Sequence, residues 1–195
     1  MGEILKNNEN KILIFTKTKA GADQLAFIIG REMKIRAGAI HGDVAQHRRE
    51  DTLAQFRHGR IRVLVATDVA SRGIDINDIT HVINFDMPNT VEDYVHRIGR
   101  TARGSNSKGV AVTFFSHDDS HLAAKLVQVL DKAKQEVEPE LRDLSFVRNN
   151  KQNKNYNRFN GSTVWNNRQN YGEQRRARQQ SWGYDGGQSL VMTHW

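Results

Sequence analysis

Short runs of β-branched and apolar residues alternate with helix-like patterns between Lys11 and Phe115, and this alternation restricts the possible folds more than any other feature. Strands that are joined by crossover helices run parallel, and a parallel sheet is covered on both faces. The pattern predicts strands at 11–15, 36–40, 62–66, 81–85 and 110–115, and helices at 20–34, 45–56, 120–134 and after a Thr90 cap. We therefore expect one α/β domain over residues 11–144, with helices on both faces of a parallel sheet.

The predicted strands end in polar loops, which begin at Thr16, His41, Thr67 and Asp86. In an open parallel sheet, the ligand crevice lies beyond the carboxyl ends of the strands. Functional residues are therefore expected in these loops.

The composition restricts the class of protein. The 195 residues are enough for one domain and an appendage. The absence of cysteine excludes disulfides and thiolate metal sites and agrees with a reducing compartment. No apolar run reaches the roughly 18 residues of a membrane span, and residues 1–10 lack the apolar core of a signal peptide. We expect a monomer of the cytoplasm and/or nucleus that is not secreted, with residues 1–10 as a linker.

The basic charge is concentrated in the C-terminal segment. From Arg148 onward there are eight Lys or Arg and two acidic residues, so this segment carries six of the seven net positive charges. Residues 145–195 are rich in Asn, Gln, Arg and Gly and have no apolar period, which predicts a disordered tail. Arginines interleaved with aromatics, including all three tryptophans, favour RNA binding over a mere linker.

The segment HRIGRTAR, residues 96–103, carries the strongest chemical signal. Helical spacing would place His96, Arg100 and Arg103 on one face. Arginines on a helix are usually a solvated face, but here Gly99, Thr101 and Ala102 provide a small-residue surface beside them. Paired arginines on such a surface suit an anionic ligand, and an arginine on a transferring phosphoryl group raises the rate by roughly 10³–10⁵.

Two other loops are candidates for ligand contacts. In VATDVASRGIDI, residues 65–76, Asp75 follows Gly73 and could accept hydrogen bonds from ribose hydroxyls, although Asp68 and Asp75 could also be a helix cap and a turn residue. In HGDVAQHRRE, residues 41–50, Gln46 and Arg49 lie near the start of a helix, whose free N–H groups attract phosphate. Ion pairing with neighbouring acids explains this second segment almost equally well.

Taken together, these segments resemble a known family. Residues from about Lys11 to Leu141 are similar to the second RecA-like domain of DEAD-box ATP-dependent RNA helicases. ILIFTKTK matches that family's motif IV, Gln46 to Arg49 its motif IVa, VATDVASRGIDI its motif V and HRIGRTAR its motif VI. The motifs occur in the family's order and at its spacing, which argues against coincidence. Ala102 stands where the family usually has glycine, a change of one methyl group that we expect to be tolerated.

The resemblance implies a role for each site residue. Arg100 and Arg103 would be arginine fingers on the γ-phosphate of ATP, and Asp75 would bind the ribose beside Gly73. The residues that would face a first RecA-like domain are Arg72 and His96. Those that would hold the RNA sugar-phosphate backbone, largely without regard to sequence, are Thr18, Gly42, Gln46, Arg49 and Thr67. ATP would join the two domains over a bent RNA strand and so pry apart a short duplex.

The motifs of the family's first domain do not occur in the chain, neither the GxxxxGK[ST] phosphate loop nor the Asp-Glu-Ala-Asp box that holds Mg²⁺. We therefore expect Mg²⁺ to be held mainly by the first domain, no metal ligands in this chain, and no ATP hydrolysis by this chain alone. The alternative function is a non-catalytic RNA-binding or regulatory fragment. A DNA-directed motor is disfavoured by the form of motifs V and VI.

Overall fold

The computed structural model describes residues 4, 10–71, 76, 78–102, 109–146 and 188–194. In chain order the elements are β1 (Ile12–Phe15), α2 (Lys19–Glu32), β2 (Ala37–Ile40), α3 (Gln46–Arg57), β3 (Val63–Ala66), α4 (Asp68–Ser71), β4 (His81–Asn84), α5 (Val91–Ile98), β5 (Val110–Ser116), the 3₁₀ helix η1 (His117–Leu122), α6 (Ala123–Lys132), a helix over 139–146, and β6 (Gln188–His194). The predicted strands and helices are confirmed, with bounds that shift by a few residues.

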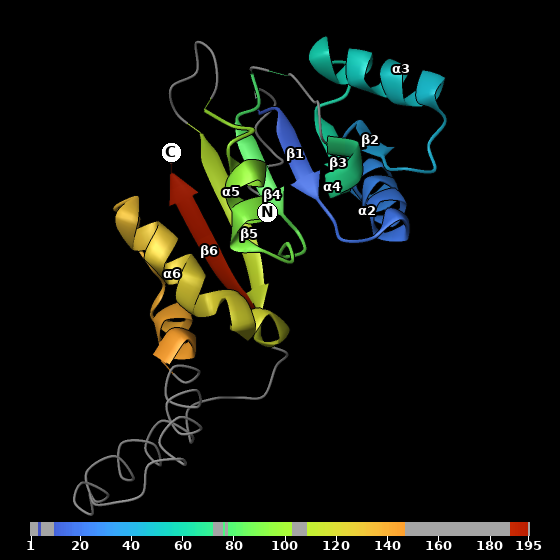
Figure 1. Cartoon of the computed structure of the whole chain (residues 1–195). Helices are drawn as coiled ribbons and strands as arrows, with labels where there is room; N and C mark the ends of the chain where they lie inside the picture. The colour runs from blue at the N-terminus through green and yellow to red at the C-terminus, as the bar shows by residue number, and fades with distance from the viewer. Residues whose placement is uncertain are drawn as a thin grey trace, which may run out of the picture.

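The strands form a single sheet in the order β2-β3-β1-β4-β5-β6 (Figure 1). β1 pairs in parallel with β3 and β4, and β2 and β5 extend the parallel sheet on either side. The predicted α/β fold with a parallel sheet is therefore confirmed.

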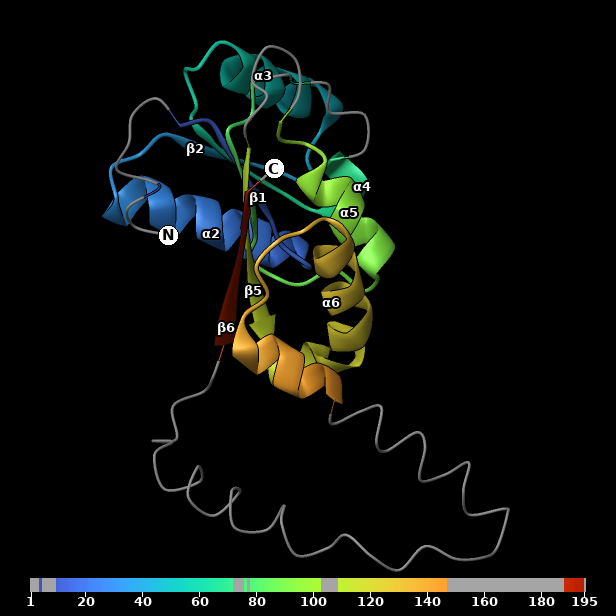
Figure 2. The same ribbon diagram turned by 90° about the vertical axis from the view of Figure 1, so that its left-hand side faces the viewer.

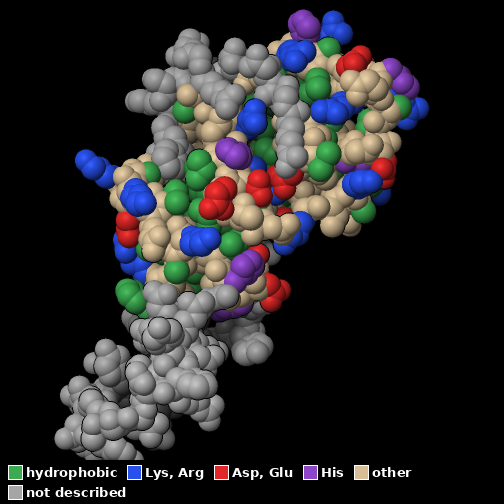
Figure 3. Space-filling view, in the orientation of Figure 1, with side chains coloured by type: hydrophobic (Ala, Val, Ile, Leu, Met, Phe, Trp, Pro, Cys, Tyr) green, Lys and Arg blue, Asp and Glu red, His purple; other side chains and the backbone are tan. Residues whose placement is uncertain are grey.

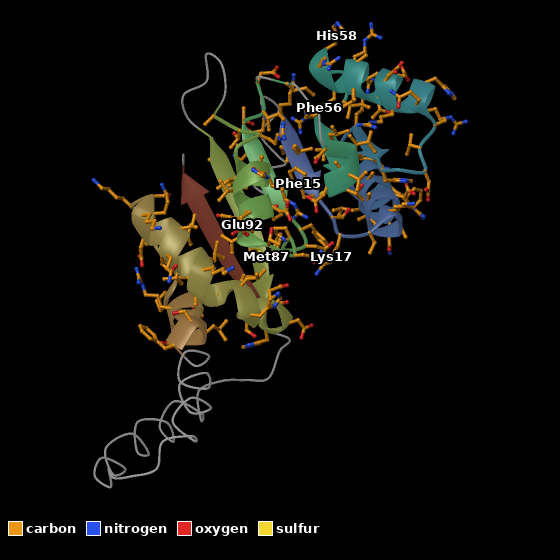
Figure 4. The ribbon with its side chains drawn as sticks, viewed as in Figure 1. Phe15, Lys17, Phe56, His58, Met87 and Glu92 are labelled. Atoms are coloured by element: carbon orange, nitrogen blue, oxygen red, sulfur yellow. The ribbon has the colours of Figure 1, made fainter. Side chains whose placement is uncertain are left out.

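The helices cover both faces of this sheet, as Figure 2 shows with α2 on one side and α4, α5 and α6 on the other. Side chains alternate between the faces along each strand. In β1, Ile12 and Ile14 pack with Ile29 of α2, whereas Leu13 and Phe15 pack in the opposite layer with Phe56 of α3. Figure 4 shows Phe56 directed from α3 toward the sheet. All four residues of β1 are fully buried, which explains its continuous apolar sequence.

Local signals set the ends of several helices. The Thr90 side chain accepts a hydrogen bond from the Asp93 N–H and caps α5, as predicted, and Thr18 caps α2 in the same way. The helix expected over 120–134 begins instead as a 3₁₀ helix at His117. Ser116 and Asp119 form a reciprocal capping box there, which starts a helical turn three residues earlier than the apolar pattern indicates.

The C-terminal segment contains one strand that the predicted tail did not include. β6 pairs antiparallel with β5 over seven residues, from Val110↔His194 to Ser116↔Gln188. Leu190, Val191 and Thr193 favour strand structure, but the polar composition of the surrounding 50 residues or so conceals this short run. Residues 145 and 146 belong to the helix over 139–146, and most of the predicted tail and of the predicted linker lies outside the described residues. Among the described residues, no helix has the length and apolar character needed to cross a membrane.

Candidate functional site

The carboxyl ends of the central strands meet at one edge of the sheet. Phe15 of β1 is level with Ala66 of β3 and Asn84 of β4. Backbone hydrogen bonds carry this alignment into the loops, because Thr16 N–H donates to the Ala66 carbonyl at 3.0 Å and Phe85 N–H donates to the Phe15 carbonyl at 3.0 Å. Figure 4 places Lys17 and Met87 at this end of the sheet. The predicted polar loops therefore lie side by side.

Arg97 is the central buried residue of this edge, and the sequence motifs do not distinguish it from the neighbouring arginines. Its side chain is 3% exposed, and its guanidinium binds both carboxylate oxygens of Asp68, at 2.6 and 2.8 Å. Nη1 donates to the Asn84 side-chain oxygen at 3.1 Å and to the Asp86 carbonyl at 2.8 Å. The guanidinium carbon lies 4.9 Å from the centroid of the Phe15 ring. These contacts fix α5 against α4 and the end of β4.

His96 and Arg100 line one cavity. The cavity has a volume of about 380 Å³, and its other lining residues are Asp68 and Asp93. His96 is exposed and Arg100 is half-buried. Figure 3 shows acidic side chains gathered over α5 and beside α4 on this face. The cavity thus combines a positively charged side chain with two carboxylates at the carboxyl edge of the sheet.

The prediction that a continuous helix extends from His96 to Arg103 is wrong. α5 ends at Ile98, and Arg100 and Thr101 make tighter turn bonds to the carbonyls of Arg97 and Ile98. The Thr101 hydroxyl then donates to the Ile79 carbonyl at 2.7 Å, which draws the chain back to the sheet. Ala102 follows in the left-handed region, with φ of 55°. His96 and Arg100 still line the same cavity, because both lie within about one turn of the end of the helix.

The backbone at Gly109 passes very close to Thr101, just after α5, and this explains why residue 109 is glycine. A Cβ added to Gly109 would lie 2.4 Å from Thr101 Oγ1 and 2.8 Å from Ala102 N, distances that no side chain can occupy. Because it has no side chain, Gly109 allows the chain to pass directly beside Thr101 just before β5 begins. Neither Thr101 nor Gly109 was predicted as a positioning residue, although Thr101 was noted as small.

The predicted RNA-backbone residues are divided between exposed and anchored positions. Thr18, Gly42 and Gln46 are exposed, and the Thr18 hydroxyl caps α2. Arg49 is half-buried and donates to the Ala70 carbonyl at 2.8 Å, which ties α3 to α4. Thr67 is 7% exposed.

The start of α3 offers free backbone donors beside these residues. Its N-cap residue, Ala45, supplies no side-chain hydrogen bond, in contrast to Thr18 in α2. The first N–H groups of the helix are therefore open to an outside acceptor.

Two side-chain contacts with α2, one of them an ion pair, support the loop that leads to α3. His41 Nε2 lies 3.0 Å from both carboxylate oxygens of Asp23 in α2. Lys19 donates to Asp43, and this hydrogen bond lowers the pKa of the Asp43 carboxyl below its usual value. The loop from His41 to Asp43 is thus attached to α2 at both ends, which holds Gly42 at the edge of the sheet.

Four predicted site residues, Arg72, Gly73, Asp75 and Arg103, lie outside the described residues. The two carboxylates of the cavity do not suit a Mg²⁺ ion. Both oxygens of Asp68 accept from Arg97, and Asp93 Oδ2 accepts from the Thr90 hydroxyl at 2.8 Å. No group of three His, Cys, Asp or Glu that could hold a metal occurs within the part of the chain that the structure describes.

Comparison with known proteins gives consistent matches. Residues 1–105 match the helicase conserved C-terminal domain family. ATP-dependent RNA helicase dbp2 of Neurospora crassa is 51% identical over 140 residues, which is 72% of this chain and 25% of that protein. The corresponding protein of Aspergillus clavatus is 49% identical over 142 residues, 73% of this chain and 26% of that protein. The chain thus spans about a quarter of the length of these curated relatives.

Solved structures show the same fold. The RNA helicase Prp28 from Chaetomium thermophilum, bound to ADP, has a TM-score of 0.63 and 40% identity, over 72% of this chain and 35% of that one. Domain 2 of the DEAD-box helicase Mss116p, bound to an RNA duplex, has a TM-score of 0.54 and 29% identity, over 69% of this chain and 55% of that one.

Proposed function

Because this chain belongs to the helicase conserved C-terminal domain family, as a C-terminal domain of DEAD-box RNA helicases, we propose that it supplies the arginine and RNA-backbone faces of an ATP-driven RNA helicase. The observation that carries the proposal is the convergence of His96 and Arg100 on one cavity, above a buried Arg97 that fixes their helix. ATP hydrolysis would require a first RecA-like domain that supplies the phosphate loop.

Arg100 acts in this proposal on the γ-phosphate. Phosphoryl transfer spreads negative charge over the equatorial oxygens, and catalysis depends mostly on positioned positive groups. The end of α5 is fixed by Arg97 and Thr101, so Arg100 is presented from a rigid support rather than a loose loop. Arg103 would be the second finger. A preorganised cation needs little rearrangement when charge develops on the phosphate.

The other nucleotide contacts follow from the family resemblance. Asp75, beside Gly73, would accept hydrogen bonds from the ribose, and Arg72 and His96 would contact the first domain. His96 is exposed at the rim of the cavity, where a second domain can reach it. Mg²⁺ would be held mainly by the first domain, since Asp68 and Asp93 are engaged by Arg97 and Thr90.

RNA would bind along the loops after β1, β2 and β3. The exposed Thr18, Gly42 and Gln46 and the uncapped start of α3 provide donors for phosphate oxygens. Arg49 and Thr67 are anchored in the protein and would shape this surface. Contacts of this kind position the backbone without reading bases. The RNA duplex in the Mss116p structure supports the same partner here.

The experiment is RNA-stimulated ATP hydrolysis by this chain mixed with, or fused to, a DEAD-box first domain. Arg100→Ala should lower the rate by roughly 10³-fold or more, because it removes charge from the transferring phosphate. Arg57→Ala is the matched control, an exposed arginine in the last turn of α3, and should leave the rate unchanged.

RNA affinity separates the two candidate functions. If Arg100→Ala abolishes hydrolysis and RNA binding survives, the arginine-finger role stands. If no supplied first domain restores hydrolysis although the chain binds RNA, the non-catalytic RNA-binding fragment becomes the better description. Equal activity of both variants would contradict the assignment of Arg100.

A further inference from the structure

A second cavity lies at the opposite end of the sheet from the proposed ATP and RNA site. It has a volume of about 510 Å³ and opens at the amino-terminal end of β2, next to Arg36 and Lys34. β2 is one of the two edge strands of the described sheet. Its four residues separate this cavity from His41 by roughly 13 Å at about 3.3 Å per residue. A ligand in the cavity would therefore leave the loops at the carboxyl edge free.

The floor of this cavity is apolar. Ile61 is 9% exposed and packs in the layer of α3, whereas Ile35 packs in the layer of α2, so the cavity lies where the two layers meet around the edge strand. Gln55 of α3 forms one wall, and its amide donates to Asp51 at 2.7 Å. An apolar side chain placed here would contact both core layers.

The rim is positively charged. Lys34 and Arg36 are exposed, and within the described part of the chain their side chains make no ion pair or hydrogen bond. Arg31, in the last turn of α2, pairs with Glu32 at 3.6 Å, and its guanidinium lies 5.9 Å from the ring centroid of Phe27, which is 62% exposed. Phe27 and Arg31 lie one turn apart on α2, which ends at Glu32, and Lys34 follows two residues later in the left-handed region, with φ of 56°.

Gly30 keeps the entrance open. It is the third residue from the end of α2, where glycine costs roughly 0.5–1 kcal/mol relative to alanine. Packing does not require it, because the nearest heavy atom to an added Cβ would be the Ile35 carbonyl oxygen at 3.9 Å. A larger side chain at this position would fill the space above Ile35.

We propose that this surface, comprising Phe27, Arg31, Lys34, Arg36 and the cavity over Ile35 and Ile61, binds an acidic peptide segment of a partner protein. Carboxylates of the peptide would pair with Lys34 and Arg36, and one apolar side chain would enter the cavity. RNA fits less well, because phosphate recognition needs a track of cations. Here the cations surround an apolar hollow, with the carboxylates of Glu32 and Asp51 close by.

The test begins with selection of displayed random 12-residue peptides on the immobilised full chain. Enriched peptides are then made synthetically with a fluorescent label, and their affinities are measured by anisotropy. The proposal predicts acidic sequences with an apolar residue. Gly30→Leu, which fills the entrance, should weaken binding at least tenfold, whereas Gly30→Ala, which changes the helix similarly but leaves the cavity open, should not.

Charge reversal gives a second, independent readout. Arg36→Glu should also weaken peptide binding at least tenfold, and Arg57→Glu, an exposed arginine on α3, should not. This arm remains decisive if Gly30→Leu does not fold. The proposal is overturned if no peptide is enriched, if the peptides are not acidic, or if Gly30→Leu and Arg36→Glu both retain binding. It is also overturned if labelled oligouridylate, rather than peptide, loses affinity in these variants. Hydrolysis with a supplied first domain is unaffected by this outcome, so the proposed function is tested separately.

Discussion

Arg97 of α5 and Asp68 of α4 form a two-pronged ion pair, with Nε to Oδ1 at 2.6 Å and Nη2 to Oδ2 at 2.8 Å. The arginine is 3% exposed and the aspartate 41% exposed, so one partner lies inside the protein and the other reaches the cavity surface. This pair joins the loop after β3 to the helix that carries His96 and Arg100. The position of the proposed catalytic arginine therefore depends on a carboxylate 32 residues earlier in the chain.

Asp68→Asn should destabilise the domain by about 3 kcal/mol, because it leaves the buried Arg97 charge with an amide donor in place of a carboxylate oxygen. The value lies at the lower end of the usual range for a buried pair, since Asp68 is partly solvated. Urea unfolding followed by circular dichroism measures the change.

The control is Asp131→Asn, which breaks the Arg142–Asp131 pair. That pair is also two-pronged, at 2.7 and 3.3 Å, but its side chains are 45% and 46% exposed. Its loss should cost no more than about 1 kcal/mol. If the two variants lose equal free energies of unfolding, the burial of Arg97 does not make the stability of the domain more dependent on Asp68.

Ala102→Gly should stabilise the domain by up to about 1 kcal/mol, because alanine at φ of 55° is strained and glycine is not. The gain is reduced by the greater freedom of glycine in the unfolded chain. Lys134→Gly is the matched comparison, since Lys134 has the same φ and lies away from the site. The midpoint temperature of thermal unfolding measures both effects. If this temperature rises for Lys134→Gly but falls for Ala102→Gly, the methyl group of Ala102 makes a contact that outweighs the strain.

The fold could be predicted from the sequence, because each strand of the parallel sheet is a short apolar run between polar loops. The register then follows, since parallel strands with helical crossovers align their carboxyl ends. Arg97 was missed because HRIGRTAR presents several arginines without distinguishing their environments. A signal existed in the periodicity, because Arg97 falls three residues after Tyr94 on the buried stripe of Val91, Tyr94 and Ile98.

Other features depend on contacts that sequence patterns do not carry. The end of α5 is set by Thr101, whose hydroxyl binds carbonyls near residue 80, and by the close passage of Gly109. Neither contact has a local signature. The left-handed conformation of Ala102 was hinted at only by the glycine that the family usually has there.

The Asp43 carboxyl should titrate below its usual pKa, because the Lys19 side chain donates a hydrogen bond to the charged form. A lowered folded-state pKa means that this interaction stabilises the fold above the usual aspartate pKa and is lost as the pH falls through the folded-state value. Nuclear magnetic resonance of the side-chain carboxyl follows the titration. Lys19→Gln should return the pKa toward its usual value, and an unchanged titration in that variant would exclude Lys19 as the cause.

Deletion of residues 188–195 should expose the edge of β5 to solvent. In a strand between two neighbours, successive N–H groups point to opposite sides, so about every second amide of Val110–Ser116 should exchange faster with deuterium. Within Val110–Thr113, which pair with β4, the remaining amides should keep their protection. A uniform increase along β5 would mean that the strand itself is lost, and no change would contradict its pairing with β6.

The basic C-terminal segment should add to the salt dependence of RNA binding. Each phosphate contact on a single strand contributes about 0.7 to the slope of log affinity against log salt concentration. Replacement of Arg175, Arg176 and Arg178 by glutamine should therefore reduce the slope by about 2 if all three contact phosphate. Replacement of Trp165 and Trp182 by alanine should instead weaken binding with little change in slope, because base stacking carries no charge. Anisotropy titrations of labelled single-stranded RNA over a range of salt concentrations distinguish the two contributions. A slope that is the same in the unmodified chain and the triple glutamine variant would mean that Arg175, Arg176 and Arg178 do not contact phosphate.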